Sequence, residues 1–187
     1  MKWIGKRISF EEDKLKTTIV IYPENNGWIN SIMGAWTAMW YTIGATMVWS
    51  YFKLDLSDQE GLIIIIFMVF WLYYAVKVSR RFFWLLWGKE LIKIDEVGLT
   101  YKKSIRKLGK ANLYYLENIT KMRLFHPKER SIQAVWEQSV WISGGERIEF
   151  DYSGKIVKFG KKLEEKDTQL LFKLITKRIE ERLRRKK

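Results

Sequence analysis

Residues 25–52, NNGWINSIMGAWTAMWYTIGATMVWSYF, and residues 61–76, GLIIIIFMVFWLYYAV, contain no Asp, Glu, Lys or Arg. The apolar core of a bilayer is about 30 Å thick, and an α-helix of about 20 apolar residues crosses it. Backbone polar groups in lipid must bond to one another, so segments of this kind form helices. The two stretches therefore predict a two-helix transmembrane hairpin over residues 25–88, with spans at about 29–52 and 61–84.

Basic residues flank both outer ends of this predicted hairpin. They are Lys2, Lys6, Arg7, Lys14 and Lys16 on the N-terminal side, and Lys77, Arg80, Arg81 and Lys89 on the C-terminal side. The stretch between the spans, KLDLSDQE (53–60), is instead acidic. Because positive flanks stay on the cytoplasmic side of a membrane, both termini are expected in the cytoplasm and the acidic loop outside.

Small and aromatic residues within the first span indicate how the helices pack. Gly34 and Ala38 form a small-xxx-small pair, which allows close helix–helix contact. Trp36 and Trp40 are four residues apart and share a helix face. Packing against the second span explains these residues, and contact with lipid or a partner helix is the alternative. No ionisable side chain lies in the middle of either span, which argues against a transporter or channel.

The rest of the chain reads as a β-domain closed by a helix. Alternating apolar residues predict strands at 91–94, 99–105, 111–125, 134–143, 147–152 and 155–159. From Glu164 the spacing of leucine and isoleucine becomes helical, with Leu171, Leu174, Ile175 and Ile179 expected on the buried side. Residues 7–10 and 16–22 also read as a hairpin, which is only marginally stable alone. We therefore expect residues 1–24 to join residues 89–187 in one sheet or barrel, interrupted by the membrane hairpin.

Three segments of the β-domain carry a resemblance to a known family. KELIKIDEVGLTYKKSI (89–105), YYLENITKMRL (114–124) and IEFDYSGKIVKFGKKLEEKDTQLLFKLITKRI (148–179) follow one another as in bacterial pleckstrin-homology-like domains of small membrane proteins. The resemblance implies an α+β membrane protein whose β-domain has about seven antiparallel strands capped by a C-terminal helix. It also implies a bacterial inner (cytoplasmic) membrane location and a binding or assembly role without catalytic residues.

Composition narrows the chemistry further. The chain has a formal net charge of +13, no cysteine and one histidine, His126. The carboxylates Glu11, Glu12 and Asp13 fall in a turn-like segment without histidine. We therefore expect no enzyme activity, no metal site and no cofactor.

The basic residues near the membrane and at the C-terminus are the predicted membrane-surface binding residues: Lys77, Arg80, Arg81, Arg182, Arg184, Arg185, Lys186 and Lys187. Lys77 is expected to snorkel to the interface, with Arg80 and Arg81 at headgroup level. The tail, expected to stay in water, suits anionic lipid headgroups. A solvated helix end and nucleic-acid binding are the alternatives, and no nucleic-acid motif supports the latter.

These features lead to two functional expectations. The first is a non-enzymatic, membrane-anchored interaction module, an accessory or assembly subunit of a larger inner-membrane complex with membrane-protein partners. The second is a membrane-tethered sensor whose β-domain binds a lipid headgroup or a small cytosolic ligand.

Overall fold

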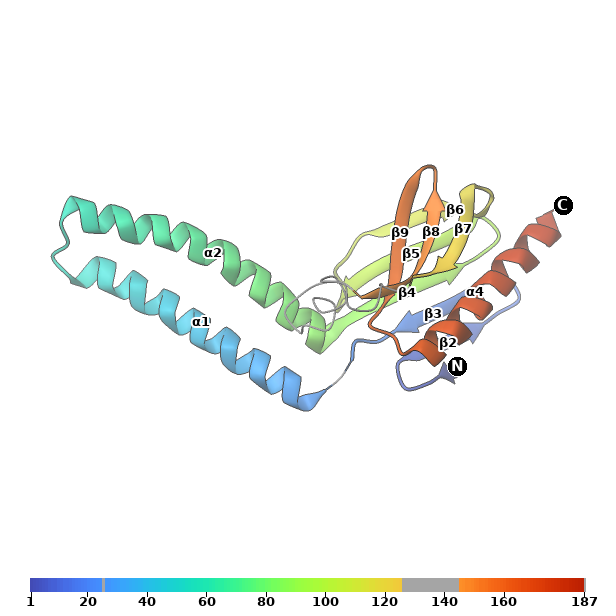
Figure 1. Ribbon diagram of the computed structural model, residues 1–187, viewed down its shortest axis with the longest axis horizontal. Helices are drawn as coiled ribbons and strands as arrows, with labels where there is room; N and C mark the ends of the chain where they lie inside the picture. The colour runs from blue at the N-terminus through green and yellow to red at the C-terminus, as the bar shows by residue number, and fades with distance from the viewer. Residues whose placement is uncertain (25, 126–144, 187) are drawn as a thin grey trace. The chain divides into compact units, whose positions relative to one another are not determined.

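A computed structural model describes residues 1–24, 26–125 and 145–186 of the chain (Figure 1). The chain folds into two compact units. Residues Met1–Glu24 and Trp87–Lys187 form a β-domain, and residues Asn25–Leu86 form a helical hairpin.

Two antiparallel sheets build the β-domain. The first contains β1 (Lys2–Ile4), β2 (Ile8–Glu12), β3 (Thr17–Ile21), β4 (Gly88–Ile94), β5 (Gly98–Ile105) and β6 (Ala111–Tyr115), adjacent in chain order. The second contains β7 (Ile119–Leu124), β8 (Glu146–Tyr152) and β9 (Lys155–Lys161). A short 3-10 helix, η1 (Leu116–Asn118), separates the sheets, and α4 (Glu165–Lys186) follows them.

The pairing of β3 with β4 joins strands that are distant in sequence. Ile21 lies opposite Glu90, and Thr17 lies opposite Ile94. The chain therefore leaves the sheet after β3 for the helical hairpin and re-enters it on the neighbouring strand.

The core of the β-domain lies between the two sheets and α4. Its fully buried side chains come from both sheets, as with Ile92, Phe150 and Phe159, and from the helix, as with Leu171 and Ile175. Period-two burial along β3 and β4 shows that one face of the first sheet carries this core.

The helical hairpin contains α1 (Gly27–Lys53) and α2 (Asp58–Trp87). The Asn26 side chain caps α1 by accepting a 3.2 Å hydrogen bond from the Trp28 backbone N–H. Before α2, Ser57 and Glu60 form a capping box, in which the Ser57 backbone N–H donates to Glu60 Oε2 at 2.9 Å. Because this cap starts the second helix early, the connection is shorter than the expected loop at 53–60.

Other differences from expectation follow from local chemistry. The segment predicted as one strand over 111–125 is broken by η1, where the chain passes from one sheet to the other. The described strands number nine, where the resemblance implied about seven. The expected strand at 134–143 and His126 fall outside the described residues.

The expectation of two spans is met in part. Among the described helices, α2 alone is long and apolar enough to cross a membrane, with a mean hydropathy of 2.2 over its most apolar stretch. The hydropathy of α1 is diluted by serine, threonine, asparagine and glycine.

Candidate functional site: the helical hairpin and the charged network of the β-domain

The seam between α1 and α2 is built from small and aromatic side chains. Its buried members include Met33, Thr37 and Gly44 on α1, and Ala75 and Ser79 on α2. Their spacings of four and seven residues place them on one face of each helix.

Gly44 lies under the indole of Trp71. A Cβ at this position would lie 2.1 Å from Trp71 Cζ2, so only glycine leaves room for the ring. The placed ring donates from Nε1 to the Trp40 carbonyl oxygen at 3.0 Å. Tyr41 packs edge-on against Trp71, with ring centroids 6.0 Å apart. Because Gly44 has no side chain, α1 leaves room for the Trp71 ring of α2, and the hydrogen-bond donor of that ring reaches α1.

A second polar contact ties the helices together. The hydroxyls of Tyr41 and Ser79 are 2.7 Å apart, and the Ser79 hydroxyl is also 2.7 Å from the Ala75 carbonyl oxygen, to which it donates. Since Ser79 donates to that carbonyl, the Tyr41 hydroxyl donates to Ser79. Interhelical hydrogen bonds of this kind hold helices together where water is absent.

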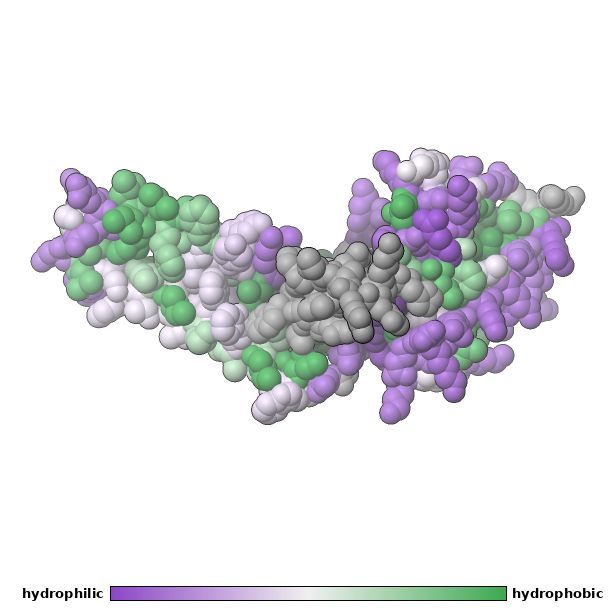
Figure 2. Space-filling model, in the orientation of Figure 1, coloured by the Kyte–Doolittle hydropathy of each residue, from purple (hydrophilic) through white to green (hydrophobic). Residues whose placement is uncertain are grey.

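Large apolar side chains are exposed on both helices of the hairpin. Figure 2 shows strong hydrophobic colouring over much of α2, paler colouring with scattered hydrophobic residues over α1, and hydrophilic residues at the hairpin tip. On α2 the exposed side chains include Leu62, Ile63, Ile65, Ile66, Phe67, Val69, Phe70, Leu72, Tyr73, Tyr74 and Val76. On α1 they include Trp28, Ile32, Trp36, Met39, Ile43, Val48, Trp49 and Phe52. A large exposed apolar surface, such as that of α2, is typical of a membrane or protein interaction site.

The residues predicted for helix–helix packing have separate positions. Trp40 lies in the seam, and a Cβ on Gly34 would lie 3.4 Å from the Phe82 ring. Ala38 is exposed, so the predicted Gly34/Ala38 pair does not form the seam. Trp36 is also exposed and stacks on Trp40 at 6.4 Å. Gly44 is the small residue at a close contact between the helices, and residue spacing did not predict it because its partner is one aromatic ring on the other helix.

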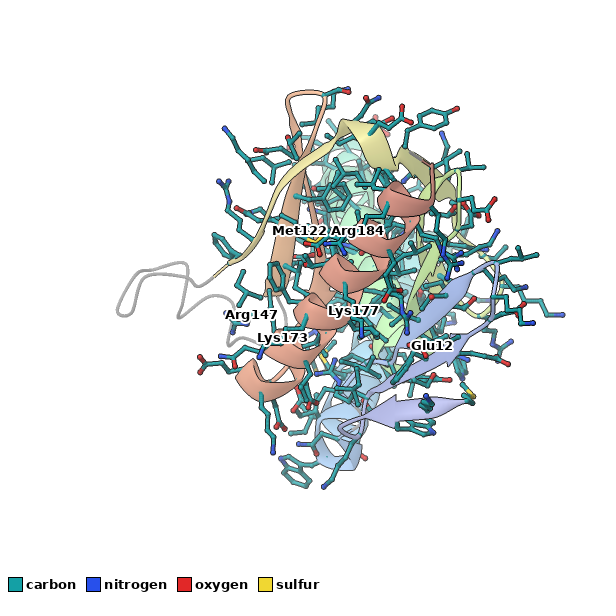
Figure 3. The ribbon with its side chains drawn as sticks, turned by 90° about the vertical axis from the view of Figure 1, so that its right-hand side faces the viewer. Glu12, Met122, Arg147, Lys173, Lys177 and Arg184 are labelled. Atoms are coloured by element: carbon teal, nitrogen blue, oxygen red, sulfur yellow. The ribbon has the colours of Figure 1, made fainter. Side chains whose placement is uncertain are left out.

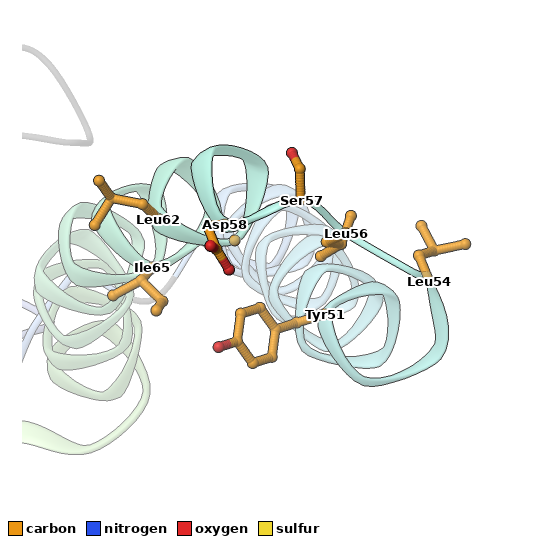
Figure 4. Close-up of a pocket in the computed structure, with 8 residues that line it drawn as sticks. Tyr51, Leu54, Leu56, Ser57, Asp58, Leu62 and Ile65 are labelled. Atoms are coloured by element: carbon orange, nitrogen blue, oxygen red, sulfur yellow. The ribbon is translucent and has the colours of Figure 1, made fainter.

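A hollow of about 400 Å³ lies at the turn of the hairpin (Figure 4). Its lining residues are Tyr51, Leu54, Leu56, Ser57, Asp58, Gly61, Leu62 and Ile65. Asp58 is the one carboxylate among them. A single carboxylate offers neither an acid/base pair nor a metal ligand set.

In the β-domain, Glu90 is the main buried charge, with 1% of its side chain exposed. Its carboxylate accepts from the backbone N–H of Gly160 at 2.8 Å and of Lys161 at 3.1 Å, and from the Tyr101 hydroxyl at 3.1 Å. Burial and the nearby Glu90 charge raise the pKa of Tyr101 well above its usual value of 10.0, so the phenol stays protonated and donates. Glu90 thereby joins the first sheet to β9.

Arg7 joins the same strands from the β1–β2 turn. Its guanidinium donates to the carbonyl oxygens of Tyr22, Lys161 and Lys162. Burial lowers the pKa of Arg7, and Glu24, Glu90 and other carboxylates partly offset this effect. Buried Glu90 and half-buried Arg7 therefore both have a structural role.

Helix α4 binds the β2–β3 turn through arginines (Figure 3, which labels Glu12 on β2). Arg178 forms an ion pair with Glu12, and Arg182 Nη1 donates to the Lys14 carbonyl oxygen at 2.9 Å. Arg182 is only 7% exposed, so the expectation that it stays in water is wrong. The apolar stripe lies where it was expected, with Leu171, Ile175 and Ile179 buried and Leu174 partly buried.

The other predicted membrane-surface residues differ in exposure. Lys77 and Arg80 are exposed, and the Lys77 ammonium lies 4.4 Å from the centre of the Tyr73 ring. Arg81 is 8% exposed, which differs from the open position expected at headgroup level. Arg184 and Arg185 are exposed. The side chain of Lys186 and the whole of Lys187 lie outside the described part of the structure.

Glu149 on β8 is a further charged centre that the sequence analysis missed. It pairs with Arg123 at 2.5 Å and with Lys158 at 3.3 Å. Burial alone would raise the pKa of Glu149, but hydrogen bonds from both cations outweigh burial and lower it below 4.5. Its alternation with Ile148 and Phe150 resembled an ordinary wet strand face, and the sequence did not show which strands would bring cations to it.

Comparison with known proteins does not assign the chain to a family. No protein-family model matches the chain, and no curated protein sequence is significantly similar to it. Within residues 1–24, 26–125 and 145–186, no three His, Cys, Asp or Glu side chains gather as a metal-binding group.

Proposed function

We propose that this chain is a membrane-anchored, non-enzymatic interaction module, an accessory or assembly subunit of a larger bacterial inner-membrane complex. The observation that carries this proposal is the insertion of an apolar-surfaced helical hairpin between two paired strands of the β-domain. Both ends of the hairpin are thereby joined covalently to neighbouring strands of the β-domain.

The lengths of both helices support a two-helix transmembrane anchor. At about 1.5 Å per residue, the 30 residues of α2 and the 27 residues of α1 give helices roughly 45 and 40 Å long. A bilayer with its headgroups is about 40–45 Å thick. Only 6% of the most apolar stretch of α2 is buried, so most of its apolar side chains are exposed.

Four hydroxyl residues of α1 are compatible with lipid because their hydroxyls bond within the helix. Ser31, Thr37, Thr42 and Thr46 each donate to the carbonyl oxygen four residues earlier, at 2.7–3.0 Å. A hydroxyl satisfied in this way does not require water. Its modest hydropathy therefore does not bar α1 from a bilayer.

The β-domain supports a binding role of pleckstrin-homology-like form. The resemblance implies about seven strands capped by a helix; here seven strands, β3–β9, are followed by α4, and β1 and β2 extend the first sheet. The buried charges described above are bonded to backbone and neighbouring side chains. Such bonds hold a scaffold together and leave these groups without a free position for chemistry.

Cysteine labelling tests the membrane topology, because the chain has no cysteine of its own. Cysteine at Ser57, in the hairpin turn, should react with an impermeant maleimide in intact cells. Cysteine at Ser153, in the β8–β9 turn, should react only after lysis. Reversed labelling would refute the orientation, and equal labelling of both would refute the anchor.

Gentle detergent extraction of the tagged full chain tests the assembly role. A subunit should elute in a complex larger than itself and retain the same membrane proteins at fixed stoichiometry. A chain that elutes alone after extraction and after membrane crosslinking would refute the subunit role.

The alternative role is a sensor that binds a lipid headgroup or a small cytosolic ligand. The β3–β4 pairing favours it, because a shift between these strands would move the two ends of the hairpin. A sensor should elute alone and melt at a higher temperature in the presence of its ligand.

A further inference from the structure

We propose that one end of the six-stranded sheet binds the anionic headgroups of the membrane, with the loop of residues 106–110 as the main contact. This is the attachment end, where β3 ends and β4 begins; the opposite end is the distal end. The proposal rests on the proposed function, because it assumes that α2 is embedded in a bilayer.

Covalent geometry brings the attachment end to the headgroups. A helix of roughly 45 Å that starts at Asp58 on one side ends with Trp87 at the opposite headgroup layer. Strand β4 begins at the next residue, Gly88, without a linker. Gly88 pairs with Ile105, the last residue of β5. The loop that follows Ile105 therefore lies beside the point where the chain leaves α2.

Direct contacts fix this loop to Trp87. The Arg106 guanidinium lies 4.0 Å from the centre of the Trp87 ring, and the Arg106 backbone N–H donates to the Trp87 carbonyl oxygen at 3.2 Å. Ile105 and Leu108 close the loop through backbone hydrogen bonds of 2.9 and 3.1 Å. Leu108, at the tip, is 79% exposed. A basic loop with an exposed apolar tip suits both the charge and the apolar part of a lipid interface.

The two ends of the sheet differ in charge. At the attachment end, the loop carries Arg106, Lys107 and Lys110, with Lys89 on β4 and Lys6 in the β1–β2 turn. At the distal end, the β4–β5 turn is Asp95-Glu96-Val97, and Glu11, Glu12 and Asp13 adjoin the β2–β3 turn. The basic loop therefore suits an anionic leaflet, although Glu24 and Asp167 also lie at this end. The distal end has basic residues too, in the β2–β3 turn and at the end of α4.

Aromatic side chains at the attachment end add a second argument. Trp3 stacks on Tyr22 with centroids 5.8 Å apart, and the Lys89 ammonium lies 5.2 Å from the Tyr22 ring. Trp3 and Trp87 are both exposed. Tryptophan and tyrosine concentrate at membrane–water interfaces, where the ring and its polar group contact different media.

The C-terminal basic residues lie at the other end of the domain. Arg182 and Arg185 donate to the Lys14 carbonyl oxygen in the β2–β3 turn. The start of α4 lies at the attachment end, where a Cβ on Gly5 would meet Asp167. Helix α4 therefore runs from the attachment end to the distal end. The loop and the tail are thus distinct candidates for the membrane-binding surface, and one experiment separates them.

The experiment uses the full chain in nanodiscs with single cysteines carrying an environment-sensitive fluorophore. Leu108→Cys reports on the loop, and Val97→Cys is the matched control, an exposed apolar residue at the other end of the same strand. In nanodiscs with anionic lipid, the label at 108 should shift to the blue and be quenched at least twofold more by lipids with quenchers near the headgroup. The label at 97 should behave as in water.

Charge variants and a membrane reference make the result decisive. Replacing Lys107 and Lys110 by Gln should reduce quenching at 108, and neutral nanodiscs should do the same. Phe70→Cys, at the middle of α2, reports whether the helix is in the bilayer. Quenching at 70 without quenching at 108 would overturn this inference but not the proposed function. Quenching at 97 or at Arg184→Cys that is stronger than at 108 would do the same. No quenching at 70 would overturn the proposed function.

Discussion

Replacing Glu90 by Gln removes one buried charge while keeping the size of the side chain. In the native protein three donors face its two oxygens, two from backbone N–H groups and one from Tyr101. Glutamine has only one oxygen, so its NH₂ group must face at least one backbone N–H. The variant therefore loses a hydrogen bond to a charged group and leaves a donor unsatisfied in the core. Together these effects cost about 2–4 kcal/mol of unfolding free energy.

This loss is large enough to measure by urea unfolding of the full chain in mild detergent. With an m-value of about 2 kcal/mol/M, the midpoint should fall by about 1–2 M. Ser9→Cys provides a local reporter, since Ser9 is buried on β2 and its hydroxyl has no hydrogen-bond partner in the described part of the chain. Maleimide should label this cysteine only when the β-domain unfolds.

Two comparisons make the reasoning refutable. Glu96→Gln, an exposed change in the distal turn, should move the midpoint very little. Tyr101→Phe should cost about 1 kcal/mol in the native background and less beside Glu90→Gln, because the two side chains share one hydrogen bond. A midpoint for Glu90→Gln equal to that of Glu96→Gln would show that the carboxylate does not join the sheets.

Three further changes test other parts of the structure. Gly44→Leu should displace the Trp71 ring and lower the unfolding free energy of the hairpin by about 1–3 kcal/mol. In mixed micelles the hairpin should then unfold at a lower SDS fraction. Truncation after Glu181 should lower the urea midpoint of the β-domain, because it removes the buried Arg182 contact with the β2–β3 turn, worth about 1–3 kcal/mol. The ion pairs of Glu149 should stabilise the β-domain above pH 4.5, and this contribution should be lost as the pH falls below 4.5 through the lowered pKa.

Each of these changes has a matched control. Gly27→Leu, where nothing lies within 4 Å of an added Cβ, should leave the hairpin unchanged. Truncation after Arg185 keeps the Arg182 contact and should cost little. Glu149→Gln should be less stable at neutral pH and lose less stability on acidification. An equally steep loss on acidification in that variant would assign the acid sensitivity to other carboxylates, such as Glu146, whose pKa the nearby Lys103 helps to lower against the effect of burial.

The sequence predicted those elements whose periodicity is local. The helix at the C-terminus and the strands at 147–152 and 155–159 follow from residue spacing and from the Ser153-Gly154 turn between them. The early start of α2 could also have been read, because Ser57-Asp58-Gln59-Glu60 is a capping box.

The contacts that the sequence did not show depend on distant partners. Arg182 lies in a run of basic residues typical of a solvated tail, and its burial follows from the β2–β3 turn reaching over it. The role of Gly44 depends on one aromatic ring on the other helix. Glu90 reads as a polar residue on an alternating strand, whereas its three donors come from β5 and β9. Such positions require the tertiary arrangement, which residue spacing does not encode.

The pairing of β3 with β4 has a consequence for folding during synthesis on the ribosome. Strand β3 emerges early, but its partner does not exist until residues 22–87 have been made, roughly 3–13 s later at ordinary rates of synthesis. During that interval the edge of β3 is open to wrong partners. If the hairpin enters a bilayer as proposed, its insertion would come before completion of the sheet. A nascent chain that fails to insert its hairpin holds the two halves of the β-domain apart, which exposes the failure to cellular quality control.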